Sequence, residues 1–598
     1  MRHQQEDRLH KNKKTISVVL FIEILLVLCG IFVLSCKREN LDYTYDYRPN
    51  QDAQKASSVR LINLSENNQL IANGDSLTNF FVPPQTNGYI PPEQLTPPGT
   101  HYFPKDGRLG LSWFVPQNLF KTDGIANLKT TFEPIPNRPI VSYEVELNLR
   151  DDYSKPKDYY LLLNHEGRVT SPDKFVEVPR AVAAPSRPDH FKIRIINFSK
   201  KLLSYSSMED ISGAISLTYA DGTSVSDATK SIASNQWSEY IELPYGTYQF
   251  KVLTANGRQI PGKGQVYYRL IDRQTSTMEM STGINSNATS GLTYTPMQTF
   301  QPGGIYTIVV HPSMFTWSTG RDDISELQNS FQIITDISEP LNQTYSQIQL
   351  ANTVIGQQAL LKVKGQSTAI TAYGSASDYT RVVAGKQTVE ITSANGQQIL
   401  SQEVELQSGQ NYTAWLYQDK DKKVNMLLAA NNLAGTIYTG KDDQGNNATI
   451  DRTKSAYPFF FRFLNFCPQI PYTTITNGSG VPYGNLANGN TSGINMTLGV
   501  LNTFAPYSSL WYDTAIDQDG FYQFMAYSSA PNRVPGDWLK QISTLSSSQL
   551  VANKKLYTNV GRKVPAHEPG VYSIAIIGDL EKTNDAEKAK FMLIKHTK

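Results

Sequence analysis

The sequence has few cysteines, no excess of either charge and almost no helical periodicity. Only 3 cysteines occur in 598 residues, which excludes a disulfide-rich scaffold and a cysteine-rich zinc site. Lys plus Arg total 55 against 53 for Asp plus Glu, whereas binding to nucleic acid through its phosphates needs a clear basic excess. Charged residues make up 18% and apolar residues 39%, so neither a disordered polyelectrolyte nor a polytopic membrane protein is expected.

The residues that are abundant favour β structure. The chain holds 33 Tyr, 24 Phe, 39 Gly and 32 Pro, a balance typical of many short strands joined by turns. A 3.6-residue apolar repeat is nearly absent, and the best short helical candidates are residues 537–545 and 584–590. The composition therefore predicts an all-β protein, and its length predicts several domains.

The N-terminal segment has the order of a secretory signal. Five basic residues between Arg2 and Lys14 precede an apolar run over residues 16–34. The run is about long enough to span a membrane, but Glu23 lies inside it, where a carboxylate is costly. The run ends in V-L-S-C, residues 33–36, which resembles the lipobox of bacterial lipoproteins. That resemblance implies that Cys36 is lipidated, that residues 1–35 are removed, and that the mature chain is attached to a membrane.

The residues after Cys36 indicate a location. The stretch K-R-E-N-L-D loosely resembles the export signals that carry lipoproteins of the Bacteroidota to the outer face of the outer membrane, although those favour acidic residues where Lys37 and Arg38 stand. The resemblance implies an outer-membrane lipoprotein exposed at the cell surface. Removal of the signal leaves 50 basic and 50 acidic residues, a formal charge of zero. Cys467 is then the one unmodified thiol, and its place after an apolar strand predicts burial.

An internal repeat divides the remaining chain. V-R-L-I-N-L-S begins at residue 59, I-R-I-I-N-F-S at residue 193 and F-R-F-L-N-F-C at residue 461, with a weaker copy, I-Q-L-A-N-T, at residue 348. The shared asparagine falls at Asn63, Asn197, Asn352 and Asn465, at intervals of 134, 155 and 113 residues. Such intervals are the size of domains, so a string of domains is predicted rather than a solenoid.

Later strands in each repeat follow a glycine turn, as in P-Y-G-T-Y-Q-F-K-V (244–252) and P-G-G-I-Y-T-I-V-V (302–310). These patterns resemble a domain-of-unknown-function family whose Ig-like repeats recur in lipid-anchored and secreted proteins of the Bacteroidota. Short strands without βα alternation predict tandem antiparallel β-sandwich domains. The predicted organisation is a signal peptide (1–35), a tether (36–57) and four sandwiches (58–185, 186–345, 346–454 and 455–598). The last sandwich is expected to carry a long insertion over residues 468–535.

No catalytic constellation, cofactor motif or metal-ligand spacing is found. Residues 257–264 match a phosphate-binding loop except at Gly264, where Ser or Thr would hold magnesium, and a hairpin turn is favoured. The histidines of the mature chain are too far apart in sequence for the short metal-binding motifs. Acidic stretches near residues 442 and 513 lack the full calcium-loop register and are predicted to be plain turns. Non-enzymatic function is therefore expected.

Aromatic residues supply the remaining candidate site. Trp415 lies in an alternating apolar strand and is predicted to be core. An exposed platform that stacks on a sugar or contacts a protein could be formed by residues of the predicted insertion, and an equally weighted alternative is that they only anchor their loop. The platform residues are Tyr507, Trp511, Tyr512, Phe521 and Tyr522.

Three functions follow from these patterns. The first is a non-catalytic cell-envelope lipoprotein that presents β-sandwich domains to a glycan or a partner protein. The second is a structural accessory subunit of an outer-membrane uptake or assembly complex. The third is a hydrolase with an unrecognised carboxylate site, which would show two acidic groups about 5–10 Å apart in a pocket.

Overall fold

The chain is all-β in the computed structural model. The model describes residues 55–65, 67–79, 99–104, 107–132, 144–163, 169, 173–202, 209–263, 267–271, 278–281, 292–293, 297–318, 323–337, 342–431, 433, 459–484, 491–501, 508–509, 523–550, 552–553, 555–557 and 568–597. These residues form 39 β strands and no α-helix, with short 3₁₀ turns at Gln117–Leu119, Asp227–Thr229 and Ser547–Gln549. The predicted fold class, tandem β-sandwiches, is confirmed. In the described part of the chain no helix has the length and apolar character needed to cross a membrane.

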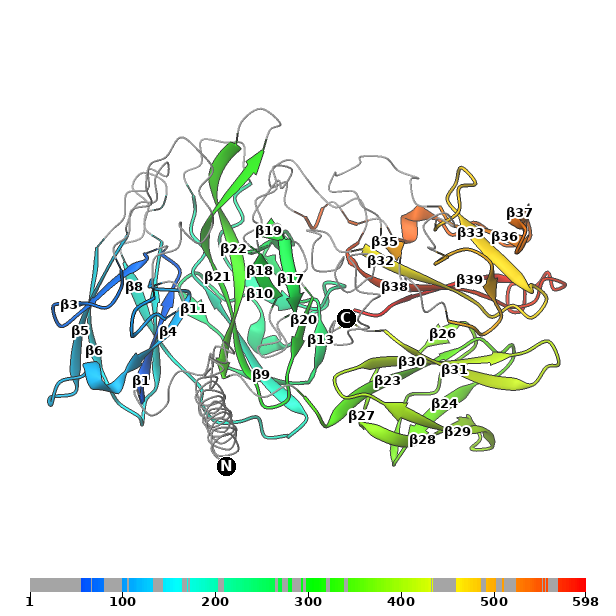
Figure 1. Ribbon diagram of the computed structural model, residues 1–598, viewed down its shortest axis with the longest axis horizontal. Helices are drawn as coiled ribbons and strands as arrows, with labels where there is room; N and C mark the ends of the chain where they lie inside the picture. The colour runs from blue at the N-terminus through cyan, green and yellow to red at the C-terminus, as the bar shows by residue number, and fades with distance from the viewer. Residues whose placement is uncertain are drawn as a thin grey trace, which may run out of the picture.

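The strands group into four successive units, called units 1 to 4 below (Figure 1). Unit 1 has one sheet in the order β4-β1-β7-β8 and a second in the order β3-β2-β5-β6. Its strands are β1 (Ala56–Asn63), β2 (Gln69–Ala72), β3 (Asp75–Ser76), β4 (Ser112–Pro116), β5 (Ile125–Thr131), β6 (Val145–Arg150), β7 (Lys157–Leu161) and β8 (Phe175–Pro179).

Unit 2 is larger. Its main sheet has the order β11-β9-β21-β22-β16-β19, with β12 also on β9, and smaller sheets are β10-β14-β15, β13-β20 and β17-β18. Its strands are β9 (His190–Asn197), β10 (Ile215–Thr218), β11 (Gln236–Trp237), β12 (Ile241–Pro244), β13 (Gly246–Tyr248), β14 (Lys251–Thr254), β15 (Gln259–Ile260), β16 (Gly262–Lys263), β17 (Tyr267–Ile271), β18 (Met278–Ser281), β19 (Leu292–Thr293), β20 (Gln298–Phe300), β21 (Ile305–Ser318) and β22 (Asp323–Ile337).

Unit 3 pairs a sheet β26-β23-β30-β31, with β27 also on β23, with a sheet β25-β24-β28-β29. Its strands are β23 (Tyr345–Asn352), β24 (Ala359–Val363), β25 (Gln366–Ser367), β26 (Ser375–Ala376), β27 (Thr380–Val383), β28 (Gly385–Ser393), β29 (Gln398–Leu406), β30 (Asn411–Gln418) and β31 (Val424–Ala430).

Unit 4 pairs a sheet β35-β32-β38-β39 with a sheet β34-β33-β36-β37. Its strands are β32 (Phe459–Asn465), β33 (Tyr472–Thr476), β34 (Met496–Thr497), β35 (Ser508–Ser509), β36 (Met525–Ala530), β37 (Arg533–Trp538), β38 (Gly570–Ile577) and β39 (Lys590–Lys595). Much of the segment expected as an insertion therefore supplies the second sheet of this unit. That expectation is wrong for β33, β34, β36 and β37, because Ile475, Phe524 and Ala526 lie in the hydrophobic core of the unit.

All four units share one strand arrangement. The strand that carries the repeat, called the opening strand, pairs in parallel with a late strand, called the closing strand: β1 with β7, β9 with β21, β23 with β30, and β32 with β38. Most other pairs are antiparallel, as predicted. The glycine turn before a closing strand needs a positive φ angle, which glycine adopts readily. Gly409, ahead of β30, has φ +74°.

The repeated asparagine ends each opening strand in the same way. Its side-chain oxygen accepts the backbone N–H two residues ahead, at Ser65, Ser199, Val354 and Cys467 in turn. Its amide group donates to a nearby backbone carbonyl, for example from Asn197 to Gly213 at 2.7 Å. The asparagine thus fixes the turn that leaves the strand, which explains why this residue recurs at domain-sized intervals.

Two further local predictions are tested by the structure. A hairpin turn does form, but at residues 254–258, where the N–H of Thr254 donates to the carbonyl of Arg258. Within the predicted segment, 257–264, residues 259–260 and 262–263 form β15 and β16, and Gly264 lies outside the described residues. The two short helices are wrong, because residues 533–538 form β37 and residues 584–588 form a turn before β39. Both segments are too short for helix formation to outcompete pairing with a neighbouring strand.

Candidate functional site

The units dock in pairs through the sheets that contain the opening strands. Between units 1 and 2 the apolar contact includes Ile62, Tyr160, Ile196, Phe198 and Val309, all fully buried. Between units 3 and 4 it includes Ala351, Trp415, Leu464, Phe466 and Ala575. These sheets are therefore buried on both faces, one against the core of their own unit and one against the neighbouring unit.

The repeat encodes this double burial residue by residue. In unit 1, Val59 and Leu61 enter the unit's own core, whereas Arg60 and Ile62 face unit 2. A strand with one wet face alternates apolar and polar residues, whereas this motif is nearly continuous in apolar residues. That continuity, interrupted by a single arginine, is the sequence signal for a second buried face.

Each unit contributes three aligned polar positions to the paired face, here called its polar trio. The first lies in the opening strand, the second is its parallel partner in the closing strand, and the third lies in or directly after the following strand. The trios are Arg60, Asp158 and Arg180 in unit 1; Arg194, Thr307 and Asp336 in unit 2; Gln349, Thr413 and Asn431 in unit 3; and Arg462, Ser573 and His596 in unit 4.

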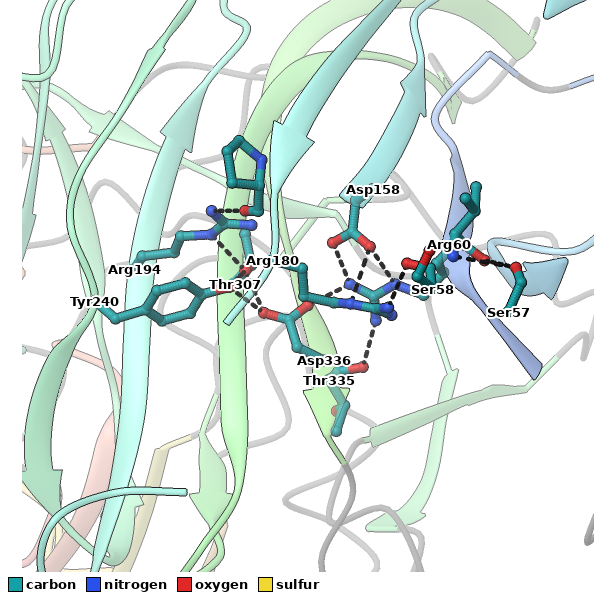
Figure 2. A network of polar contacts seen from close by, with 12 residues as sticks. Ser57, Ser58, Arg60, Asp158, Arg180, Arg194, Tyr240, Thr307, Thr335 and Asp336 are labelled. Atoms are coloured by element: carbon teal, nitrogen blue, oxygen red, sulfur yellow. Dashed lines mark hydrogen bonds and ion pairs between the residues drawn. The ribbon is translucent and has the colours of Figure 1, made fainter. Parts of the chain in front are cut away.

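In the first pair the two trios bond across the interface (Figure 2). Nε and Nη2 of Arg60 lie 2.9 Å and 2.6 Å from the two carboxylate oxygens of Asp158, and Nη2 also lies 2.5 Å from Oδ1 of Asp336 in unit 2. Asp336 further accepts from the hydroxyls of Tyr240 and Thr307, at 2.9 Å and 2.5 Å. Charge-assisted bonds of this kind fix both distance and register.

The arginines also reach across to the backbone of the opposite unit. Nη1 of Arg60 donates to the carbonyl of Thr335 at 3.1 Å, and Nη1 of Arg194 donates to the carbonyl of Pro179 at 2.6 Å. Each acceptor directly precedes the third trio residue of the other unit. The two units therefore contact each other reciprocally, as in an isologous dimer.

The second pair repeats this geometry with fewer charges. Nη1 of Arg462 donates to the carbonyl of Ala430 at 3.0 Å, and Nη2 donates to Oδ1 of Asn431 at 2.5 Å. In the reverse direction Nε2 of Gln349 lies 3.1 Å from Nδ1 of His596. Nε2 of His596 lies 2.7 Å from the hydroxyl of Ser573. Amides and hydroxyls here take the place of the two carboxylates of the first pair.

Burial sets the electrostatics of these groups. Burial opposes the charge on Arg60, but the carboxylates of Asp158 and Asp336 outweigh it and raise the pKa of the guanidinium. Burial, together with the charge of Arg462, lowers the pKa of His596 well below its ordinary value, so this imidazole is neutral at pH 7. The side chains of Arg60, Asp158 and Asp336 are fully buried, so this carboxylate pair is closed to a substrate.

Unit 2 also contacts units 3 and 4. The amide of Gln347 donates to the carbonyl of Tyr245 at 2.9 Å, and Arg381 forms an ion pair with Asp189. Contacts to unit 4 include the ion pair between Nζ of Lys251 and a carboxylate oxygen of Glu568 at 2.6 Å and a bridge between Gln259 and Tyr557.

A cavity of about 540 Å³ lies where these three units meet. Unit 2 lines it with Tyr248, unit 3 with Gln349, Arg381 and Asn411, and unit 4 with residues 592–597. A second cavity of about 420 Å³ shares Tyr379 and Arg381 with the first. Sequence reasoning missed both, since their walls come from segments far apart in the chain.

The predicted site residues have mixed outcomes. Cys36 and the aromatic platform (Tyr507, Trp511, Tyr512, Phe521 and Tyr522) lie outside the described residues, as do the two acidic stretches. Cys467 is buried as predicted, and burial raises the pKa of its thiol to about 12. Trp415 is also buried as predicted, but it packs against Phe466 of unit 4 rather than in the core of its own unit.

No group of three His, Cys, Asp or Glu side chains that could hold a metal is found within the described part of the chain.

No family model and no curated protein matches the sequence. The solved structures with some similarity include the Bacillus anthracis TIE protein, a candidate cell adhesion protein from Bacteroides fragilis and a major pilin subunit of Bacillus cereus.

These likenesses are weak. The TIE protein is 10% identical with a TM-score of 0.10, and the match covers 60% of this chain and 49% of that one. The adhesion protein is 11% identical with a TM-score of 0.11, covering 40% and 96%. The pilin is 12% identical with a TM-score of 0.08, covering 65% and 99%. At such scores the strand topology described above, and not the likeness, carries the fold.

Proposed function

We propose that this chain is a non-catalytic lipoprotein of the outer membrane, anchored through Cys36, whose β-sandwich units present binding surfaces at the cell exterior to a glycan or a partner protein. The observation that carries the proposal is that buried charged side chains dock two units onto each other. Bonds of 2.5–2.9 Å join the fully buried side chains of Arg60, Asp158 and Asp336 at the interface between units 1 and 2. Paired ion clusters of this kind give register rather than chemistry.

The location depends on the lipobox. A Cys36→Ala variant is expected to lose acyl labelling and to keep its signal peptide, because the alanine offers no thiol for a diacylglycerol. Cys467→Ala is the matched control and should label like the wild type, since that thiol is buried. Equal acyl labelling of Cys36→Ala and wild type contradicts the anchor.

The binding role is tested with the full lipidated chain in detergent, applied to a glycan array and used in parallel as bait for outer-membrane proteins. Retention of a glycan class supports the proposal. Silence on the array together with a stoichiometric outer-membrane partner assigns the accessory-subunit role instead. Release of reducing ends from a bound glycan would identify a hydrolase and refute the non-catalytic assignment.

A further inference from the structure

The cavity between units 2, 3 and 4 exists only when all three are docked. Tyr248 comes from β13, Arg381 from β27, and Lys595 from the end of β39. Its volume of about 540 Å³ lies within the range of about 300–1,000 Å³ typical of small-molecule sites. Asp221 and Asp378 are exposed lining residues, so the cavity is open to solvent on their side.

Two cations in its wall have unused hydrogen-bonding capacity. Nε of Arg381 donates to Asp189, but neither Nη atom donates to any residue that the structure describes. Nζ of Lys595 lies 3.9 Å from the nearest oxygen of Glu568 and donates no hydrogen bond within the described residues, although its side chain is only 24% exposed. Both cations therefore lie near an acid, Arg381 beside Asp189 and Lys595 beside Glu568, yet each keeps N–H groups that have no acceptor among the described residues. A carboxylate entering the cavity would gain charge-assisted bonds from these N–H groups.

The charge on Lys595 persists at neutral pH. Burial lowers the pKa of its ammonium group to about 8, with Lys251 acting in the same direction and the carboxylates of Glu568 and Asp221 in the opposite one. At pH 7 the group is therefore still mostly protonated, and an anion beside it would raise its pKa again.

Neutral polar groups complete the wall. The Oδ1 atom of Asn411 accepts no hydrogen bond from the described residues, while its amide donates to Gln347. An amide oxygen in the wall favours a ligand that donates a hydrogen bond, as a sugar hydroxyl does. Tyr248 and Tyr379 add aromatic surface.

The adjoining cavity extends the same chemistry. It holds Arg187 and Lys364 besides the shared Arg381, and the acid Asp189 among them is already paired with Arg187 and Arg381. A ligand that repeats its carboxylate along a chain could therefore meet a cation in each cavity, with Arg381 at their common wall.

We propose that these two cavities form a binding site for a carboxylated oligosaccharide, with a carboxylate held by Lys595 and Arg381 and a sugar hydroxyl held by Asn411. This inference rests on the proposed glycan-binding role and names the class of glycan. No single unit contains the site, because its walls come from three units.

The test uses the full chain in detergent on an array of oligosaccharides that contain galacturonate, glucuronate or sialate, each beside its methyl ester. The free acids are expected to bind. The esters are expected to bind at least about tenfold more weakly, because esterification removes the charge but keeps the ring. Binding to none of the acids overturns the inference, whatever other glycans are retained.

Calorimetry with the best acid then tests the residues. Lys595→Met keeps the length of the side chain and should weaken binding at least about tenfold. Lys582→Met, on an exposed turn of the same unit, is the matched control and should bind like the wild type. Arg381→Gln should also weaken binding, and hydrogen exchange of residues 245–248 checks that the junction stays closed.

The two levels of the proposal fail differently. Unchanged affinity of Lys595→Met for the acid places the site elsewhere and overturns this inference, while glycan binding itself stands. Retention of neutral glycans alone has the same meaning. Silence toward every glycan, with capture of a membrane partner, removes the glycan-binding role as well.

Discussion

Replacing Arg60 by methionine should open the interface between units 1 and 2. The change removes the bonds of the guanidinium to Asp158, to Asp336 and to the backbone of Thr335, while methionine keeps much of the apolar stem. Asp336 retains the hydroxyl of Tyr240. Among the described residues Asp158 then keeps only Arg180, whose Nε lies 3.6 Å away.

The expected cost follows from leaving a carboxylate without its partner in a closed interface. Removing one member of a buried ion pair typically destabilises by about 3–5 kcal/mol. At about 1.4 kcal/mol per decade, the opening equilibrium should shift by roughly two to four decades. Arg60→Met with Asp158→Asn should recover part of this loss, because the uncompensated charge is gone.

Hydrogen exchange measures this opening unit by unit, since a chain of several domains need not unfold in one step. Amides of β1 and β9 should lose protection in Arg60→Met, while those of units 3 and 4 serve as an internal reference. Arg150→Met, at an exposed position of β6, should stay within about 0.5 kcal/mol of wild type. Wild-type protection of residues 59–63 and 193–197 in Arg60→Met would refute the structural role of the network.

Further predictions concern units 3 and 4. Trp415→Ala should destabilise the contact between these units by about 3–5 kcal/mol in urea unfolding, whereas Trp538→Ala, at a residue 43% exposed, should change stability by less than about 0.5 kcal/mol; equal effects would contradict the buried assignment. Because the pKa of His596 is lowered in the folded state, its contribution to stability is present above the unfolded pKa of about 6.5 and is lost as pH falls, by up to about 1.4 kcal/mol per pH unit. A His596→Gln variant should show a flatter stability profile between pH 6.5 and 5, and an unchanged slope would disprove the linkage. Cys467, with a thiol pKa of about 12, should react with a thiol reagent at pH 8 only after denaturation, and rapid labelling of a native Cys29→Ala/Cys36→Ala variant, in which Cys467 is the one remaining thiol, would contradict its burial.

The sequence predicts the positions of the opening strands well, but it does not predict which of their faces packs against another unit. The repeat locates all four opening strands, because an apolar run ending in a turn-forming asparagine is a local signal. Which face meets another unit depends on contacts such as that between Arg60 and Asp336, which are 276 residues apart. Local patterns carry no information on such pairings, although a lone arginine in an apolar strand indicates that a buried partner must exist.

The candidate site was less predictable than the fold. Tyr248, Arg381 and Lys595 become neighbours around the cavity only through the docking of three units, and each looks like an ordinary strand residue in its own segment. The second sheet of unit 4 was also missed, because its strands are short and separated by polar stretches that are typical of a loop.

Because the sheets with the opening strands are buried on both faces, the chain cannot be divided or recombined freely between units. A unit cut out alone would expose an apolar sheet face around a polar trio, such as Arg60, Asp158 and Arg180, and would be prone to aggregate. The smallest piece expected to be soluble on its own is therefore a pair of units. Gene duplication that lengthens such a protein should add sandwiches two at a time, and exchange of a single sandwich between relatives should succeed only when the opposing trio is exchanged with it.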